Sequence, residues 1–225
     1  MKSLTLLAFA VASFGPLVGN FAHAAGRPNL ATVQNAEAWR LANATAETME
    51  MEGKSVVRLT AQGDSANRIA GLALPVGAEF ATGTIEVDLK GTSTKQRSFL
   101  GVVFNAIDDR TFEGIYFRPF NFKATDPVNR RAVQYIAWPE NTWEKLRKDR
   151  PGQFENRVDP VPNPDGWFHA RIEVTENRVM VFVDGAQEPS LSIDRLAHST
   201  AKRPVGLFVD VADGLYANLQ ITPDK

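Results

Sequence analysis

The sequence places two carboxylic acids, Glu86 and Asp88, two positions apart in the segment TIEVDLK (84–90). Residues i and i+2 of a β-strand point to the same face, about 6.6 Å apart along the strand. That separation is close to the roughly 5–5.5 Å between the carboxyl groups of a retaining glycosidase. The pair is therefore a candidate for catalysis. The alternative is a solvent-facing row of side chains that continues to Lys90, opposite a core row of aliphatic residues.

A second candidate site combines an arginine with amides and aromatic rings. In FEGIYFRPFNF (112–122), Tyr116 and Arg118 would share one face of a strand, and Asn121 follows directly after the strand break. Gln134 is another polar residue inside an apolar segment. Sugars need donors for their hydroxyls and ring faces for their C–H surfaces. We therefore predict that these four residues bind substrate.

The alternative for these polar residues is structural. Arg118 would then pair with a nearby acid such as Glu113, or extend its charged end to the rim, and Gln134 would satisfy the backbone of a loop. The residues by themselves leave both interpretations open.

Four tryptophans divide into two groups. Trp138 and Trp143 flank the segment AWPENTW (137–143), and on a loop they would form stacking platforms for sugar rings. The alternative is that they close one end of the fold. Trp39 and Trp167 are expected to be packing residues.

Several chemistries are excluded by the residue types. The chain has no cysteine, which excludes disulfide and thiolate chemistry, and a net charge of −1, which gives no basic footprint for nucleic acid. After the N-terminal segment only His169 and His198 remain, too few for a three-histidine zinc centre. A general-base role for His169 is an alternative to that of an ordinary sheet histidine.

Aspartates near two turns bear on metal binding. Asp210 and Asp213 in DVADG, together with Asp108 and Asp109, carry the oxygen ligands that suit Ca²⁺. Aspartate before glycine is also ordinary turn chemistry. We predict no cofactor and no metal site, with a structural calcium ion as the alternative.

The elements that position these residues are predicted to be β-strands. From Ser55 onward, short apolar segments recur about every ten residues, divided by turn-forming residues. Strands are predicted near 55–60, 67–74, 83–90, 98–105, 112–118, 131–137, 167–175, 178–184, 190–193, 204–210 and 215–221. The segment WFHARIEVTENRVMVFVDG (167–185) alternates clearly and predicts a hairpin. The run KLRKDR (145–150) is predicted to be a solvated helix or loop. One domain of two packed sheets is the expected fold.

The N-terminal residues predict export. Residues 1–24 combine a basic start, an apolar run and the small-residue site AHA, which is typical of a secretory signal peptide, and no later segment could span a bilayer. Residues 25–54 are predicted to be a lead-in that packs on the sandwich, and 55–225 its main domain. The expected location is the periplasm or the medium.

The order of these motifs resembles the concanavalin A-like lectin/glucanase superfamily, and within it exported bacterial proteins of the laminin-G-like and keto-disaccharide-hydrolase type. The resemblance is carried by GTIEVDLKG, FLGVVFNAIDDRTFEGIYFRPFNF, RAVQYIAW, the 167–185 hairpin and VGLFVDVADGLYANLQI, over about residues 55–222. It implies an all-β, antiparallel two-sheet jelly-roll β-sandwich that holds an oligo- or polysaccharide on the concave face of its front sheet.

The resemblance also bears on activity. Laminarinase-type enzymes carry three acids at alternating positions of the catalytic strand, whereas the third position here is Lys90. The predicted function is therefore an exported carbohydrate-binding protein. The alternatives are a glycoside hydrolase, of the keto-disaccharide or laminarinase-like kind, and a laminin-G-like structural or interaction module. The oligomeric state is left open.

Overall fold

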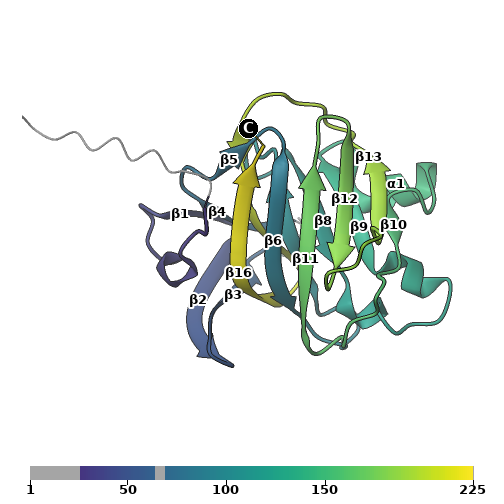
Figure 1. The fold of residues 1–225 in the computed structure, drawn as a ribbon, viewed down its shortest axis with the longest axis horizontal. Helices are drawn as coiled ribbons and strands as arrows, with labels where there is room; N and C mark the ends of the chain where they lie inside the picture. The colour runs from purple at the N-terminus through teal and green to yellow at the C-terminus, as the bar shows by residue number, and fades with distance from the viewer. Residues whose placement is uncertain (1–25, 64–68, 225) are drawn as a thin grey trace, which may run out of the picture.

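The structure is a computed structural model that describes residues 26–63 and 69–224. Two seven-stranded antiparallel sheets, here called sheet A and sheet B, pack face to face. Figure 1 shows them with sheet B toward the viewer. Sheet A has the spatial order β1 (Trp39–Ala42), β4 (Gly71–Pro75), β15 (Gly206–Asp210), β7 (Phe99–Phe104), β8 (Phe112–Phe117), β9 (Val133–Trp138) and β10 (Glu155–Asn156). Sheet B has the order β13 (Leu191–Asp194), β12 (Arg178–Val183), β11 (Trp167–Val174), β6 (Gly83–Lys90), β16 (Asp213–Pro223), β3 (Lys54–Ala61) and β2 (Ala44–Met51).

Smaller elements connect the strands. β5 (Glu79–Phe80) and β14 (Arg203–Pro204) form a separate two-stranded sheet. The helical turns are η1 (Leu30–Thr32), η2 (Pro119–Asn121) and η3 (Val128–Arg131), and the one α-helix of the described residues is α1 (Trp143–Asp149), which lies beside β9. The predicted all-β sandwich of two antiparallel sheets is confirmed.

Alternation of residue types explains sheet B. In β6, Ile85, Val87 and Leu89 are fully buried between the sheets, whereas Thr84, Glu86, Asp88 and Lys90 point outward and are half-buried. β11 pairs with β6 along its whole length and alternates in the same way. One face of sheet B therefore builds the core, and its outer face carries polar side chains.

Sheet A is buried on both faces. All six residues of β8 are buried, as are the first five of β9. The inward side chains join the main core, and the outward ones form a second apolar cluster. This second cluster contains Ala70, Leu72, Leu74, Val103, Ala106, Phe112, Tyr116, Ile136 and Phe208. Strands covered on both sides read as continuous apolar runs, which is how β7 to β9 appear in the sequence.

An ion pair lies inside the sandwich. Glu113 of β8 points inward and is 0% exposed, and Arg195, which follows β13, lies 2.8 Å from its carboxylate. Tyr135 donates to the same carboxylate at 2.6 Å, and Asn105 does so at 2.9 Å. Arg195 also donates to two backbone carbonyls, of Ala81 and Thr175. The structural alternative in which Glu113 pairs with Arg118 is therefore wrong, because Glu113 is on the opposite face of its strand.

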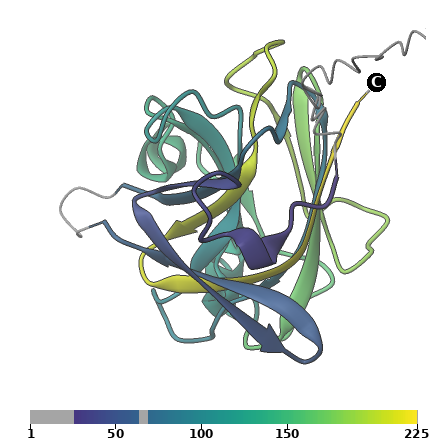
Figure 2. The ribbon, with the colours of Figure 1, turned by 90° about the vertical axis from the view of Figure 1, so that its left-hand side faces the viewer.

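The N-terminal part of the chain contributes more than a lead-in. Within residues 25–54, β1 pairs with β4 and β2 pairs with β3 over its whole length, so that this segment supplies an edge strand to each sheet. Figure 2 views the molecule from the side where these strands lie. Edge strands with one solvated face, such as ATAETMEM in β2, carry too little apolar sequence to be recognised as strands.

Other expectations can be placed on the fold. Trp39 packs in the core as predicted. The run at 145–150 lies mostly in α1, which Thr142 caps by accepting a hydrogen bond from the Lys145 backbone. No helix among the described residues is long and apolar enough to cross a membrane. The predicted signal peptide, 1–24, lies outside the described residues.

Candidate functional site

The polar residues predicted to bind substrate meet on the outer face of sheet A. β8 and β9 are neighbours, and their register places Tyr116 directly opposite Gln134. Arg118 follows β8 and precedes η2, whose first residue is Pro119. Its guanidinium carbon lies 4.8 Å from the ring centroid of Tyr116 and 5.8 Å from that of Phe99. The strand end and the turn thus fold Arg118 back over the aromatic cluster.

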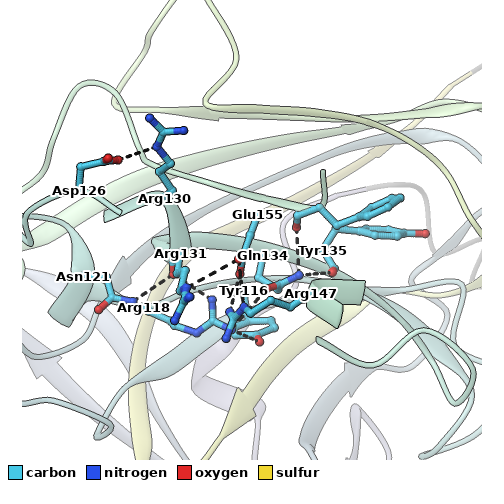
Figure 3. A network of polar contacts seen from close by, with 11 residues as sticks. Tyr116, Arg118, Asn121, Asp126, Arg130, Arg131, Gln134, Tyr135, Arg147 and Glu155 are labelled. Carbon is cyan, nitrogen blue, oxygen red and sulfur yellow. Dashed lines mark hydrogen bonds and ion pairs between the residues drawn. The ribbon is translucent and has the colours of Figure 1, made fainter. Parts of the chain in front are cut away.

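Arg118 is only 5% exposed, and its contacts are with neutral groups (Figure 3). It donates from Nη2 to the Tyr116 hydroxyl at 2.6 Å and, more weakly, to Gln134 Oε1 at 3.5 Å. From Nη1 it donates to the Arg131 carbonyl at 2.9 Å. Asn121 donates to that same carbonyl at 3.2 Å. Among the described residues, no carboxylate lies within 4.0 Å of the Arg118 guanidinium.

Gln134 has two roles. Its amide nitrogen donates to the carbonyls of Tyr135 and Phe154, at 2.9 and 3.1 Å. The predicted structural alternative, in which Gln134 satisfies loop backbone, therefore holds for the amide nitrogen. Its oxygen faces Arg118, so the same side chain also fixes the guanidinium.

Burial controls the ionisation of the central pair. Burial lowers the pKa of Arg118, and the nearby positive charges of Arg147 and Arg131 act in the same direction. Burial raises the pKa of the Tyr116 hydroxyl far above neutral pH, so this hydroxyl stays protonated and accepts from Arg118 through its lone pairs. The site thus combines a guanidinium whose positive charge is disfavoured by burial with a phenol that stays neutral.

A second layer of charge lies beside this pair. Glu155 of β10 lies opposite Gln134 and accepts hydrogen bonds from both Nε and Nη2 of Arg147. Its carboxylate also lies 3.9 Å from Nε of Arg131. The carbon of the Arg147 guanidinium lies 4.7 Å from the ring centroid of Trp143. Sequence reasoning missed these residues, because Arg147 stands in a charged run that reads as solvated, and β10 has only two residues.

Aromatic rings line the same face. Trp138 stacks on Phe112 with ring centroids 6.1 Å apart and planes at 7°, and Tyr116 stacks on Phe208 at 5.4 Å. Trp138 and Trp143 are both half-buried and pack against the second apolar cluster. The structure therefore brings Tyr116, Arg118, Asn121, Gln134, Trp138 and Trp143 to one side of sheet A.

The predicted catalytic pair lies on the other side of the molecule. Glu86 and Asp88 point outward from β6 of sheet B and share a face, as the spacing predicts. Asp88 accepts from Lys54 at 2.8 Å and from Asn218 at 2.7 Å, and lies 2.9 Å from His169 Nδ1. His169 Nε2 lies 3.5 Å from Glu86. The two predicted sets of site residues are thus on opposite outer faces.

The pKa shifts of this cluster restrict its chemistry. Burial opposes ionisation of Asp88, but hydrogen bonds from His169, Lys54 and Asn218 outweigh it and hold the pKa well below the usual value. The hydrogen bond to Asp88 raises the pKa of His169. A carboxylate held ionised in this way is a poor proton donor, and the raised pKa of His169 extends the pH range in which its ring is protonated and cannot accept a proton.

Trp167 shares this outer face. It stands opposite Lys90 in the register and is half-buried, with the ammonium groups of Lys54 and Lys90 at 5.1 and 5.8 Å from its ring. The expectation of a packing role is met only in part, because its position in β11 points outward.

Two hollows of the surface lie away from both clusters. One, of about 490 Å³, is lined by the N-terminal residues 26–29 and by parts of the β4–β5 connection. The other, of about 400 Å³, lies between residues 156–160 and 186–190. Neither includes a residue of the predicted sites.

The aspartates considered for calcium have other partners. Asp108 accepts from the Arg110 backbone at 2.8 Å, and Asp109 accepts from Asn43 at 3.1 Å. Within residues 26–63 and 69–224, no group of three or more acids and histidines is arranged to hold a metal ion.

Comparisons with known proteins identify the fold. The sequence matches no protein-family model and none of the curated proteins. The carbohydrate binding module CBM66 from Bacillus subtilis matches with a TM-score of 0.55 and 14% identity, over 82% of this chain and 95% of that one. A glycosyl hydrolase family protein from Mycobacterium fortuitum matches at 0.50 and 13%, over 83% and 92%. The exoplasmic/lumenal domain of VIP36, in its Ca²⁺-bound form, matches at 0.51 and 14%, over 84% of each chain. Identities this low show the fold alone, and the chain has the concanavalin A-like jelly-roll fold of lectins and glucanases.

Proposed function

We propose that the protein binds carbohydrate on the outer face of sheet A. The observation that carries this proposal is the convergence of Arg118, Tyr116 and Gln134 beside two half-buried tryptophans. The site combines buried, oriented hydrogen-bond donors with the ring faces of half-buried tryptophans, and a sugar requires both kinds of group. The fold shared with a carbohydrate binding module supports the proposal without identifying the ligand.

Each residue has a part in this proposal. A guanidinium has five N–H groups, and the three contacts of Arg118 use three of them, so sugar oxygens can take up the others. Tyr116 and Gln134 fix the orientation of that guanidinium. Trp138 and Trp143 would stack on the C–H faces of the sugar rings, and Asn121 would border the site.

Glycoside hydrolysis through Glu86 and Asp88 is the weaker proposal. Hydrolysis needs one carboxylic acid that keeps its proton near neutral pH. Asp88 is held ionised by three hydrogen bonds, and Glu86 lies 3.5 Å from the Nε2 atom of the same histidine, His169. We therefore assign these residues to a stabilising cluster rather than to a reaction.

We propose in addition that the protein is exported to the periplasm or the medium. This rests on the N-terminal sequence alone, which has the basic start, apolar run and small-residue site of a signal peptide. N-terminal sequencing of the protein recovered from outside the cytoplasm would test it, with a start at Ala25 as the expected result.

Binding can be tested by calorimetric titration with a panel of neutral and acidic oligosaccharides. Trp143→Ala should weaken the binding of any ligand found by about 2- to 12-fold, because a stacked ring is worth about 0.5–1.5 kcal/mol. Trp167→Ala is the matched control: it removes a half-buried tryptophan from the opposite sheet and should leave affinity unchanged. Absence of binding to every oligosaccharide would overturn the proposal.

A further inference from the structure

We propose that the ligand of this face is an acidic glycan, whose carboxylate or sulfate group pairs with Arg118. The inference rests on the proposed carbohydrate-binding function and makes its ligand class specific. Three observations carry it: the lack of an acidic partner for Arg118 among the described residues, the ion pair formed by Arg195, which is also buried, and the two arginines that flank the site.

Arg195 provides the comparison. Both arginines are more than nine-tenths buried, with 2% of Arg195 and 5% of Arg118 exposed. Arg195 contacts both oxygens of Glu113 from Nε, at 3.1 and 2.9 Å, and approaches the carboxylate again from Nη2 at 2.8 Å. The carboxylate of Glu113, which is itself fully buried, neutralises the charge of Arg195. This is how the molecule compensates a guanidinium that serves its structure.

Arg118 has no such compensation. Its partners in the described residues are a phenol, an amide and a backbone carbonyl, all of them neutral. Removing a charge from water without a counter-ion is strongly unfavourable, and neutral acceptors recover only part of that cost. An external anion that pairs with the guanidinium would recover more, and a carboxylate suits its planar fork of donors.

Two other arginines flank the Arg118 guanidinium. Arg147 and Arg131 are near enough to lower the pKa of Arg118. The single acid among the main influences on Arg118, Glu155, is already bound through both oxygens by Arg147. Glu144 and Asp210 are the other acids of this region, and both act on the Tyr116 hydroxyl. Two further arginines thus stand near the Arg118 guanidinium, and the carboxylate nearest to them, that of Glu155, is already bound by Arg147.

The aromatic rings distinguish this surface from a site for a bare anion. Trp138 and Trp143 are half-buried beside the cluster, and Phe99 contacts both Tyr116 and Arg118. A ligand that satisfies both parts of the surface has an anionic group attached to a ring with C–H faces. Hexuronic acids and sulfated sugars have this chemistry.

Calorimetric titration of the full chain at low and at moderate salt tests the inference. The acidic probes are trigalacturonate, a hyaluronan tetrasaccharide and a chondroitin sulfate tetrasaccharide. The neutral probes are laminaritriose, cellotriose, mannotriose and fully methyl-esterified trigalacturonate, which keeps the sugar and removes the charge. We expect at least one acidic probe to bind at least about 10-fold more tightly than every neutral probe, with affinity that falls as salt rises. Uronate and sulfate probes tell the two anion sources apart.

Variants separate Arg118 from general electrostatics. Arg118→Met should weaken binding of the acidic probe by about 10- to 100-fold, and Arg118→Lys by less, because it keeps the charge and loses the fork. Arg178→Met makes the same change of net charge at an exposed, ion-paired position of sheet B and should have no effect. Full circular dichroism and thermal-unfolding profiles would show that each variant is folded.

The outcomes separate this inference from the proposed function. Binding of neutral probes alone would overturn the acidic ligand and leave carbohydrate binding in place. Acidic binding that Arg118→Met leaves unchanged would also overturn the inference. Binding of no probe at all would contradict both.

Discussion

The two outer faces of the sandwich both carry charged side chains, but they compensate those charges differently. On sheet B, Asp88 lies within hydrogen-bonding distance of Lys54 and His169, and Lys90 lies 3.5 Å from Glu52. On sheet A, Arg118 is the more deeply buried charge and has neutral partners alone among the described residues. The charges of sheet B are compensated within the fold, whereas for Arg118 we propose that a ligand supplies the counter-charge.

The difference also teaches how little the spacing of acidic residues means by itself. Any half-buried strand places alternate polar residues on one face, so two acids at i and i+2 are common without catalysis. In β6 the acids point outward, as a catalytic pair would, and Asp88 is then neutralised by its neighbours on β11, β3 and β16. The neighbouring strands decide the chemistry, and they come from distant parts of the sequence.

The largest effect on the free energy of unfolding is expected at the buried ion pair between Glu113 and Arg195. Glu113→Gln would leave Arg195 buried without a counter-ion and should lower the free energy of unfolding by about 3–5 kcal/mol. Guanidinium chloride denaturation measures this. Glu86→Gln, at a half-exposed position, should change it by less than about 0.5 kcal/mol. A loss below about 1 kcal/mol in Glu113→Gln would show that a buried guanidinium without a counter-ion costs this protein little stability. The contrast between Arg195 and Arg118 would then no longer indicate a ligand.

The next effect concerns the paired face. Asp88→Asn removes the charge that three neighbours hold and should cost about 1–3 kcal/mol near neutral pH, with no change in ligand affinity. The pKa of Asp88 is lower in the folded state, so its contribution is complete above the unfolded value of about 3.9 and is lost as the pH falls below it. The stability difference between the two proteins should therefore shrink in acid. A pH series of urea denaturations measures it, and a constant difference down to strongly acidic solution would contradict the assignment.

A smaller effect on stability is expected at the unpaired charge. Arg118→Met removes a buried cation whose burial cost its neutral hydrogen bonds offset only in part, so the free energy of unfolding should rise slightly or fall by no more than about 1 kcal/mol. The same variant should abolish most ligand binding. Denaturation and titration of one preparation give both values. A loss of 3 kcal/mol or more, close to that of Glu113→Gln, would mean that Arg118 serves the fold and not a ligand.

The sequence allowed the fold to be predicted because alternation and burial are local properties. Strands β3, β6 to β9, β11 to β13, β15 and β16 lie close to their predicted positions, since their side chains repeat with a period of two or form short apolar runs. The sequence did not predict β1, β2, β5, β10 and β14. They are short or lie at sheet edges, where pairing with a neighbour and not residue type makes the strand.

The candidate site could be predicted only in part. Tyr116, Arg118 and Gln134 stand out as polar residues in apolar strands, and adjacent strands bring them together. Glu155, Arg147 and Arg131 could not be found, because they read as ordinary surface charges until the fold places them beside Arg118. The local sequence pattern also does not show that Glu113 faces the interior and pairs there with Arg195.

The smallest expected effect is at His169, where the paired face can be tested by titration of a single group. The hydrogen bond to Asp88 raises its pKa, so its contribution to stability is complete below the unfolded value of about 6.5 and is lost as the pH rises through the folded one. The side chain is 39% exposed, so solvent screening should keep the effect of His169→Gln below about 0.5 kcal/mol. NMR titration of the His169 ring should give a pKa above 6.5 that returns toward this value in Asp88→Asn. An unchanged pKa of His169 in Asp88→Asn would mean that Asp88 and His169 do not interact electrostatically. The charges of sheet B would then be no better compensated than that of Arg118.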